Sequence, residues 1–204
     1  MQNAVIDREI KTILHFTRLS NLDSILSEGI VSRAILESRS QVPTFNDQYR
    51  IDGHREAICC SISFPNYKML WGLRQQNPNE EWVILALKKE ILWEKDCAFC
   101  IENAASNNVT NISIEDRKGL NAFNQMFEEI DGKPDRNTLG IPDKYPTNPQ
   151  AEVLVFDTIE TDYILGVFCQ SQTRANILKQ QYTDFHFKVG RSAFRARTDY
   201  RHWQ

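Results

Sequence analysis

The sequence has 204 residues, 41% of them hydrophobic, and its 24 basic and 27 acidic side chains give a formal net charge of −3. This length is sufficient for a substantial core in one large domain or two small ones. No apolar run approaches the roughly 20 residues of a membrane span. Charges at residues 7–9 interrupt the segment that a signal peptide needs to be apolar. We therefore expect a soluble, cytoplasmic and monomeric protein with no membrane partner.

The charges are unevenly distributed along the chain. Residues 188–201 include five basic residues and one acid, whereas pairs of acids occur in the middle of the chain. A local basic stripe is what contacts phosphates, so the acidic total does not exclude a polyanionic partner. A solvated, charged end of the chain explains the same composition equally well.

The five cysteines are odd in number and irregularly spaced, and Cys59 and Cys60 are adjacent inside an apolar run. This usage indicates buried thiols in a reducing compartment. Cys97 and Cys100 form one Cys-x-x-Cys without a second pair or a nearby histidine, which favours a structural thiol pair over a metal or redox site. The four histidines lack the spacing of metal ligands, so we expect no metal.

The first elements predicted are a strand and a helix that follows it directly. Residues 12–17 alternate as a strand does, with His15 and Thr17 on one face. Ser20 or Asn21 then caps a helix that ends at Gly29. Polar strand residues beside a helix N-terminus suit a negatively charged ligand.

The rest of the chain predicts one α+β domain, because it contains no internal repeat and no linker. Long polar or irregular segments are expected at 38–55, 102–118 and 131–148, and loops of this length are usually functional or disordered. Strands are expected at 58–64, 82–87, 153–156, 164–169 and 185–189, and helices around 69–71, at 120–130 and at 172–181, with a turn or short helix at 88–92.

Glu152 stands where a proline-containing loop changes into a continuous apolar run at residues 153–156. Such a run is typical of a strand covered on both faces. A carboxylate entering it is costly to bury unless it is paired, hydrogen-bonded or used at a cleft. A solvent-facing glutamate at the strand edge is the alternative. Gln150 and Glu152 fall on the same side of an extended segment, which favours a polar site above that face.

Four segments together resemble the DarT family of bacterial ADP-ribosyltransferase toxins, which modify a base in DNA and are neutralised by a macrodomain antitoxin. The first is His-Phe-Thr-x-x-x-Asn-Leu-x-x-Ile-Leu at 15–26, and the second is Asn-Asp-x-x-Arg-x-Asp-Gly at 46–53. The others are Ser-Ile-Ser-Phe-Pro-Asn-Tyr-Lys-Met at 61–69 and Pro-Gln-Ala-Glu-Val-Leu-Val at 149–155. They occur in order over nearly the whole chain, and four in sequence are far more specific than any one alone.

The resemblance implies a single ADP-ribosyltransferase domain over residues 1–204, with a central split β-sheet, flanking helices and a cleft for NAD. It implies that His15 and Thr17 contact the nicotinamide ribose side of NAD, with Asn21 close by. Arg50 would be the essential arginine of the cleft, and Arg55, which is close to it in the sequence, is the alternative assignment. The sequence has Trp71 where the family often has a tyrosine, so stacking on nicotinamide is retained and a phenol donor is lost.

The same resemblance makes Glu152 the catalytic glutamate and residues 131–150 the substrate-recognition loop. Cleavage of the bond between nicotinamide and ribose builds positive charge on the ribose, which a fixed carboxylate stabilises. A guanidinium such as that of Arg50 suits the pyrophosphate. Glu152 is also a candidate general base for the acceptor nitrogen.

The expected substrate is a guanine or thymine base of single-stranded DNA, because a base in a duplex is unreachable. The candidate nucleic-acid contacts are Gln150, Arg191, Arg195 and Arg197, with aromatic residues interleaved among the arginines for base stacking. A final strand with solvated arginines is the alternative for this segment. The same transfer onto RNA, transfer to a protein side chain and a catalytically silent binding module are the competing hypotheses for the whole chain.

Overall fold

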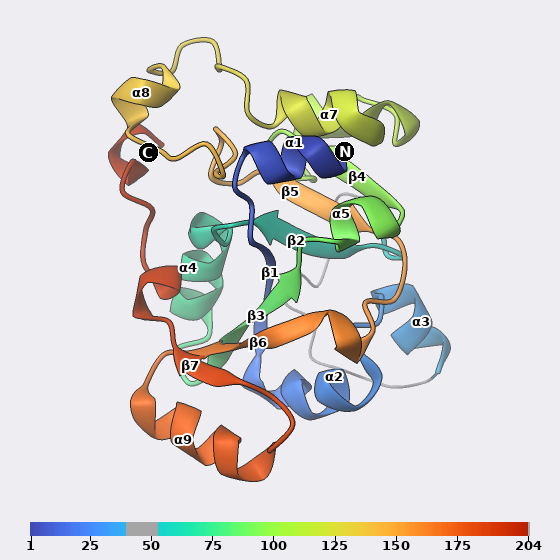
Figure 1. Ribbon diagram of the computed structural model, residues 1–204, viewed down its shortest axis with the longest axis vertical. Coiled ribbons are helices and arrows are strands. Elements are labelled where there is room, and N and C mark those ends of the chain that lie inside the picture. The colour runs from blue at the N-terminus through green and yellow to red at the C-terminus, as the bar shows by residue number, and fades with distance from the viewer. Residues whose placement is uncertain (40–52, 204) are drawn as a thin grey trace.

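The computed structural model describes residues 1–39 and 53–203, and its helices surround one seven-stranded sheet (Figure 1). The strands are β1 (Thr12–Arg18), β2 (Ile58–Ile62), β3 (Trp82–Lys88), β4 (Cys97–Cys100), β5 (Glu152–Val155), β6 (Ile164–Cys169) and β7 (Phe187–Val189). The helices are α1 (Gln2–Asp7), α2 (Leu22–Glu28), α3 (Arg33–Ser38), α4 (Tyr67–Gln76), α5 (Ile91–Glu94), α6 (Asn107–Thr110), α7 (Gly119–Gln125), α8 (Arg136–Leu139) and α9 (Gln172–Gln181). None of the helices in these two ranges is long and apolar enough to cross a membrane.

The sheet is split between β2 and β1, which pair at only two positions. The strand order is β4-β5-β2-β1-β3-β6-β7, with antiparallel neighbours except for the parallel pair β6 and β7. Whereas β1 pairs with β3 along its whole length, its register with β2 joins Ile13 to Ile62 and Leu14 to Ser61. The strands diverge beyond these pairs. The predicted α+β fold with a split central sheet is therefore confirmed.

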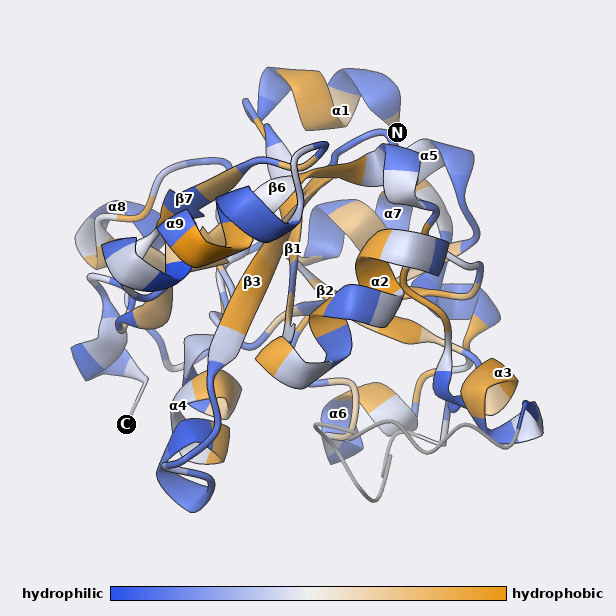
Figure 2. Cartoon of the chain, turned by 90° about the horizontal axis from the view of Figure 1, so that it is seen from below, coloured by the Kyte–Doolittle hydropathy of each residue, from blue (hydrophilic) through white to orange (hydrophobic). Residues whose placement is uncertain are grey.

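Strand β3 is covered on both faces, which explains its uninterrupted apolar sequence. Leu85 and Leu87 belong to the large core that extends towards α1 and α7, whereas Ile84 and Ala86 pack in the cluster beneath α4. Helices α2 and α9 cover a third cluster around Val83. Figure 2 shows the resulting hydrophobic colour along β3 inside a shell of more polar helices.

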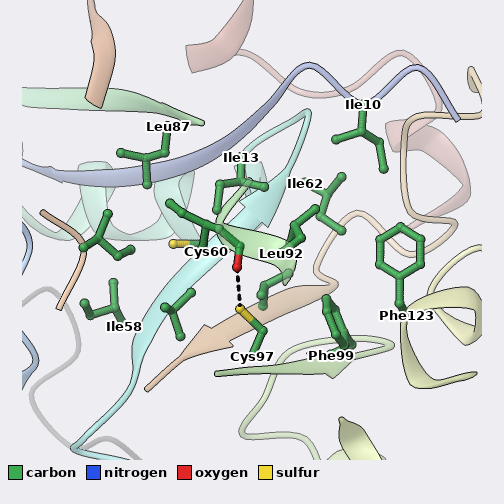
Figure 3. Close-up of a cluster of buried hydrophobic side chains, with 14 of the residues drawn as sticks. Ile10, Ile13, Ile58, Cys60, Ile62, Leu87, Leu92, Cys97, Phe99 and Phe123 are labelled. Atoms are coloured by element: carbon green, nitrogen blue, oxygen red, sulfur yellow. Dashed lines mark hydrogen bonds between the residues drawn. The ribbon is translucent and has the colours of Figure 1, made fainter. Parts of the chain in front are cut away.

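The largest core cluster joins the β4-β5-β2 half of the sheet to the helices above it (Figure 3). Phe99 of β4 packs edge to face on Phe123 of α7, with ring centroids 5.5 Å apart. Cys97 donates through Sγ to the Ile91 carbonyl at 3.4 Å, and burial raises the pKa of its thiol to about 12. The five cysteines are free thiols, as the sequence predicted. Four of them are buried and serve as small apolar core residues, whereas Cys59 is half-buried.

Several predicted elements have the observed bounds or differ by one or two residues at an end. Strand β6 and helix α9 agree at both ends, and β7 begins two residues later than predicted. Strand β4 was missed, because four residues without alternation carry little signal until β5 pairs with them.

The helix predicted for 120–130 is shorter, because α7 ends at Gln125. Met126 and Phe127 still point into the core, but the Met126 carbonyl accepts a hydrogen bond from the Thr147 N–H at 2.9 Å. The chain therefore continues as a turn that is joined to the loop before β5, and the apolar spacing beyond residue 125 does not belong to a helix.

Candidate active site

A pocket opens where β1 and β2 diverge. Its lining comes from β1, α2, the start of α3, β2, α4, the turn after β4 and the first residue of β5. The residues that bear on its chemistry are His15, Thr17, Asn21, Arg33, Ser61, Met69, Asn103, Ala104 and Glu152. Four residues that the sequence selected separately, His15, Thr17, Asn21 and Glu152, thus lie around one cavity.

Glu152 begins β5 and is only 5% exposed. Its Oε2 accepts the Ala104 N–H at 2.9 Å, and its Oε1 accepts the Asn66 side-chain amide at 3.1 Å. A longer contact of 3.5 Å joins the same oxygen to the Asn103 amide. The donors in these three contacts are neutral amide groups, and together they fix the orientation of the carboxylate. The arrangement excludes the alternative of a solvent-facing glutamate at the strand edge.

The opposite wall of the pocket is formed by His15, Thr17 and Asn21. His15 bridges the divergent strands, since its Nδ1 lies 2.8 Å from the Cys59 carbonyl. A carbonyl oxygen only accepts, so this ring nitrogen carries a hydrogen. Asn21 precedes α2 and donates to the Thr17 hydroxyl at 3.0 Å. The amide thereby orders a buried hydroxyl beside the pocket instead of capping the helix with its side chain.

The stretch between α2 and α3 forms the outer side of the pocket. Gly29 ends α2 with a φ of +88°, and a Cβ there would lie 2.4 Å from the Ile159 carbonyl oxygen. Only glycine fits this close approach. The Ser32 hydroxyl caps α3, whose first residue, Arg33, faces the pocket and donates through Nε to Glu37 at 2.7 Å. A cation is thus held beside the cavity that contains Glu152.

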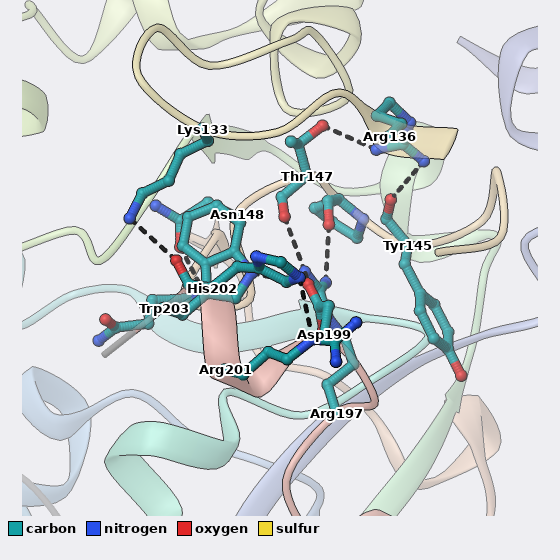
Figure 4. Close-up of polar contacts among 12 residues, drawn as sticks. Lys133, Arg136, Tyr145, Thr147, Asn148, Arg197, Asp199, Arg201, His202 and Trp203 are labelled. Carbon is teal, nitrogen blue, oxygen red and sulfur yellow. Dashed lines mark hydrogen bonds and ion pairs between the residues drawn. The ribbon is translucent and has the colours of Figure 1, made fainter. Parts of the chain in front are cut away.

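The loop that leads into β5 is held from two sides by buried or half-buried arginines (Figure 4). Arg136 donates to the Thr147 hydroxyl at 2.7 Å and to the Tyr145 carbonyl at 2.9 Å. Arg197 donates to the Pro146 carbonyl at 2.8 Å and to the Thr147 carbonyl at 2.7 Å. The segment 131–148, predicted to be irregular, contains helix α8 and is ordered by these contacts before the chain reaches Glu152.

Arg197 requires a correction. The sequence suggested that it contacts nucleic acid, but its side chain is buried and paired with buried Asp199. Its donors are engaged by Asp199 and the two loop carbonyls, so no face is left for a phosphate. Arg191 and Arg195 are exposed on the tail next to α4, and Gln150 is half-buried in the turn that precedes β5 and lies outside the pocket lining. Their proposed contacts with nucleic acid stay predictions.

The other predicted cofactor residues are placed differently from the four in the pocket. Trp71 is 63% exposed on α4 and lies outside the pocket lining, to which this helix contributes Met69. Two positions along a helix differ by about 200° in direction, so residues 69 and 71 face opposite sides. Arg50 lies outside the described residues. Arg55 is exposed and is 3.4 Å from Glu37.

Sequence reasoning missed the groups that hold Glu152 and the cation at α3. Asn66 had a local signal, because an asparagine after a proline and before an apolar helix is a typical N-cap. Its second partner, Glu152, is 86 residues away, and spacing gives no indication of such a contact. Asn103, Ala104 and Arg33 lie in short or irregular segments with no motif.

Comparison with known families decides the relationship. The model of the family described as "ssDNA thymidine ADP-ribosyltransferase, DarT" matches residues 14–201. The chain belongs to the DarT family. No curated protein matches the sequence closely enough to count as a relative.

Solved DarT structures share the fold. The structure of Thermosipho africanus DarTG in complex with ADP-ribose has a TM-score of 0.63 and 20% identity over 90% of this chain. This chain spans 51% of the DarTG chain, about half its length. The structure of Thermus sp. 2.9 DarT in complex with carba-NAD+ has a TM-score of 0.61 and 14% identity, covering 92% of this chain and 99% of the other. A third, Thermus sp. 2.9 DarT in complex with ADP-ribosylated ssDNA, has a TM-score of 0.54 and 12% identity, covering 92% and 97%.

At these identities the structural likeness shows a common DarT fold. Within the described ranges, no group of three or more histidine, cysteine, aspartate or glutamate side chains is arranged to hold a metal ion.

Proposed function

We propose that this chain transfers ADP-ribose from NAD to a thymine base of single-stranded DNA. The observation that carries the proposal is a buried Glu152, held by the Asn66 amide and the Ala104 N–H, in the same pocket as His15, Thr17 and Asn21. The family description names single-stranded DNA and thymidine, and Thermus sp. 2.9 DarT, a structure of the same fold, is in complex with ADP-ribosylated ssDNA. The support for thymine over guanine comes from the family description alone.

Glu152 acts on both partners of the transfer. When the bond from the ribose to nicotinamide breaks, nicotinamide leaves with the bonding electrons and positive charge develops at the ribose. The fixed carboxylate stabilises that charge, as acids do in glycosyl transfer. The base nitrogen then forms the new bond to the ribose carbon, and its proton passes to Glu152 as general base.

NAD is held by the remaining groups of the pocket. We assign His15 and Thr17 to the nicotinamide ribose, next to Glu152, with Asn21 fixing the Thr17 hydroxyl. Arg33 is placed to contact the pyrophosphate, because its side chain lines the pocket and a planar guanidinium suits phosphate oxygens. Arg50, outside the described residues, stays the predicted essential arginine of the cleft.

The DNA strand approaches from the side of the loop 131–150, which we propose as the substrate-recognition loop, with Gln150, Arg191 and Arg195 as its contacts. The proposed biological role is that of a toxin in a toxin-antitoxin pair, with a macrodomain protein that removes ADP-ribose as its antitoxin. The similarity to a DarTG structure in complex with ADP-ribose supports this pairing. We propose the cytoplasm as the place of reaction, because NAD, DNA and reduced thiols occur there together.

The proposal is tested by incubating the protein and NAD with matched single-stranded DNA, duplex DNA and RNA oligonucleotides of mixed sequence, followed by mass spectrometry. We expect one ADP-ribosyl group on thymine of the single-stranded DNA. Modification of guanine would correct the base, and modification of RNA alone would correct the nucleic acid, since the 2′-OH is the distinguishing group. No modification of any oligonucleotide would contradict the proposed function.

A further inference from the structure

One buried asparagine connects the start of α4 to the carboxylate of Glu152. Asn66 is 1% exposed, and its side-chain Nδ2 donates to Glu152 Oε1 at 3.1 Å. Its Oδ1 accepts the Met69 N–H at 3.1 Å and so caps α4. Its own backbone N–H donates to the Ser61 hydroxyl at 3.1 Å. The residue therefore joins β2, α4 and β5 at one point beside the pocket.

The orientation of the Asn66 amide is determined by its two partners. The Met69 N–H is a donor and requires the amide oxygen. The ionised carboxylate of Glu152 only accepts and requires the NH2 group. A rotated amide would place oxygen against oxygen and nitrogen against N–H, which are two repulsive contacts. The helix cap thus directs a donor at the carboxylate.

We propose that Asn66 is a positioning residue that keeps Glu152 ionised and correctly oriented for transfer. This inference rests on the proposed function of Glu152. A hydrogen bond to the charged form of a carboxyl group favours that form. A neutral amide provides this stabilisation and leaves the negative charge available to the ribose, whereas a lysine or arginine in its place would neutralise the charge. Asn66 itself needs no contact with NAD or DNA for this role.

The first test is the substitution Asn66→Asp, which keeps the shape of the side chain and its ability to cap α4. It replaces the donor facing Glu152 with a second carboxylate, and two carboxylates in one site do not ionise independently. We expect transfer at neutral pH to fall, and the acid limb of the pH–rate profile to move upward by about one pH unit or more. Activity should return in part as the pH is raised.

Asn66→Ser is the matched control, because serine also caps a helix but its shorter side chain does not reach Glu152. We expect it to lower the rate with a smaller displacement of the acid limb than Asn66→Asp. A wild-type profile for Asn66→Asp would overturn the proposal. Equal loss of activity in both variants without any displacement would also overturn it, since that result indicates a purely structural role.

A second test measures stability and needs no activity. Asn66→Asp is compared in the wild-type background and in Glu152→Gln, where the glutamine amide is able to donate to the new aspartate. We expect Asn66→Asp to lower the melting temperature much more beside Glu152 than beside Gln at that position, as a double-mutant cycle detects for residues in contact. If Asn66→Asp lowered the melting temperature equally in both backgrounds, or abolished folding in both, the result would contradict a direct contact between residues 66 and 152. This cycle stays informative if the wild-type protein modifies no oligonucleotide, so failure of the inference and failure of the proposed function are distinguishable.

Discussion

Arg197 and Asp199 form a buried two-point ion pair, with Nε donating to Oδ1 at 2.7 Å and Nη2 to Oδ2 at 2.6 Å. Trp203 adds a hydrogen bond from its indole nitrogen to Asp199 Oδ2 at 2.7 Å. The guanidinium also holds the carbonyls of Pro146 and Thr147, as Figure 4 shows. The C-terminal tail is thereby fastened to the loop that enters β5 at Glu152.

Arg197→Met should destabilise the protein strongly. It leaves the Asp199 carboxylate buried without its cation and two loop carbonyls without their donor, and breaking a buried pair in this way costs about 3–5 kcal/mol. Chemical denaturation measures the loss. Arg195→Met is the control, because Arg195 is exposed on the same tail, and it should change the free energy of unfolding by no more than about 0.5 kcal/mol. Equal, small losses in the two variants would show that the buried pair does not hold the tail.

Asp199 should make stability fall at acid pH. Burial alone would raise its pKa, but the hydrogen bonds and charge of Arg197 and the hydrogen bond from Trp203 outweigh burial, and the pKa lies below the ordinary 3.8. A lowered pKa in the folded state stabilises the protein above the unfolded pKa, and this contribution is lost as the pH falls through the folded value. Asp199→Asn should therefore reduce stability at neutral pH and flatten its decline below about pH 4. If the free energy of unfolding fell equally with pH in the wild-type protein and in Asp199→Asn below about pH 4, the result would contradict a lowered pKa for Asp199.

Arg33→Met should weaken NAD binding with little effect on folding. The Arg33 pair with Glu37 lies at the surface of α3, and pairs of that kind contribute about 0–1 kcal/mol. Loss of a charged contact to the pyrophosphate costs about 1.5–3 kcal/mol, which raises the dissociation constant by roughly tenfold or more. Calorimetry with NAD measures the change. Arg39→Met is the comparison, because Arg39 directly follows the same helix and has its own glutamate partner, Glu28. Unchanged affinity in Arg33→Met would remove Arg33 from the binding site.

Local sequence signals predicted the elements that depend mainly on nearby residues. Helix α9 has its apolar spacing and a serine cap, since Ser171 accepts the Arg174 N–H at 3.2 Å. Gly29 ends α2 where the backbone has a positive φ of +88°. The apolar run after Glu152 is a strand buried on both faces. These features are physical consequences of short stretches of chain, and spacing is enough to find them.

Local sequence signals did not predict the contacts between segments that are distant in the chain. Arg191, Arg195 and Arg197 look equivalent in the sequence, but Arg197 is buried because carbonyls about 50 residues earlier in the chain accept its hydrogen bonds. The family resemblance that suggested a cofactor role for Trp71 did not indicate which side of α4 faces the pocket. Likewise, the cap residue Asn66 was recognisable, whereas its contact with Glu152 depends on how β2 and β5 pair. The tertiary structure determines the burial of Arg197, the outward direction of Trp71 and the contact of Asn66 with Glu152.

In the proposed reaction, the buried Glu152 carboxylate drives ADP-ribose transfer to single-stranded DNA. The most direct test of this role is the mass of a thymine-containing single-stranded oligonucleotide after incubation with NAD and either the wild-type protein or Glu152→Gln. The substitution keeps the size of the side chain, and circular dichroism should show the same fold. We predict a gain of one ADP-ribosyl group with the wild-type protein and an unmodified oligonucleotide with Glu152→Gln. Equal modification by both proteins would contradict the account.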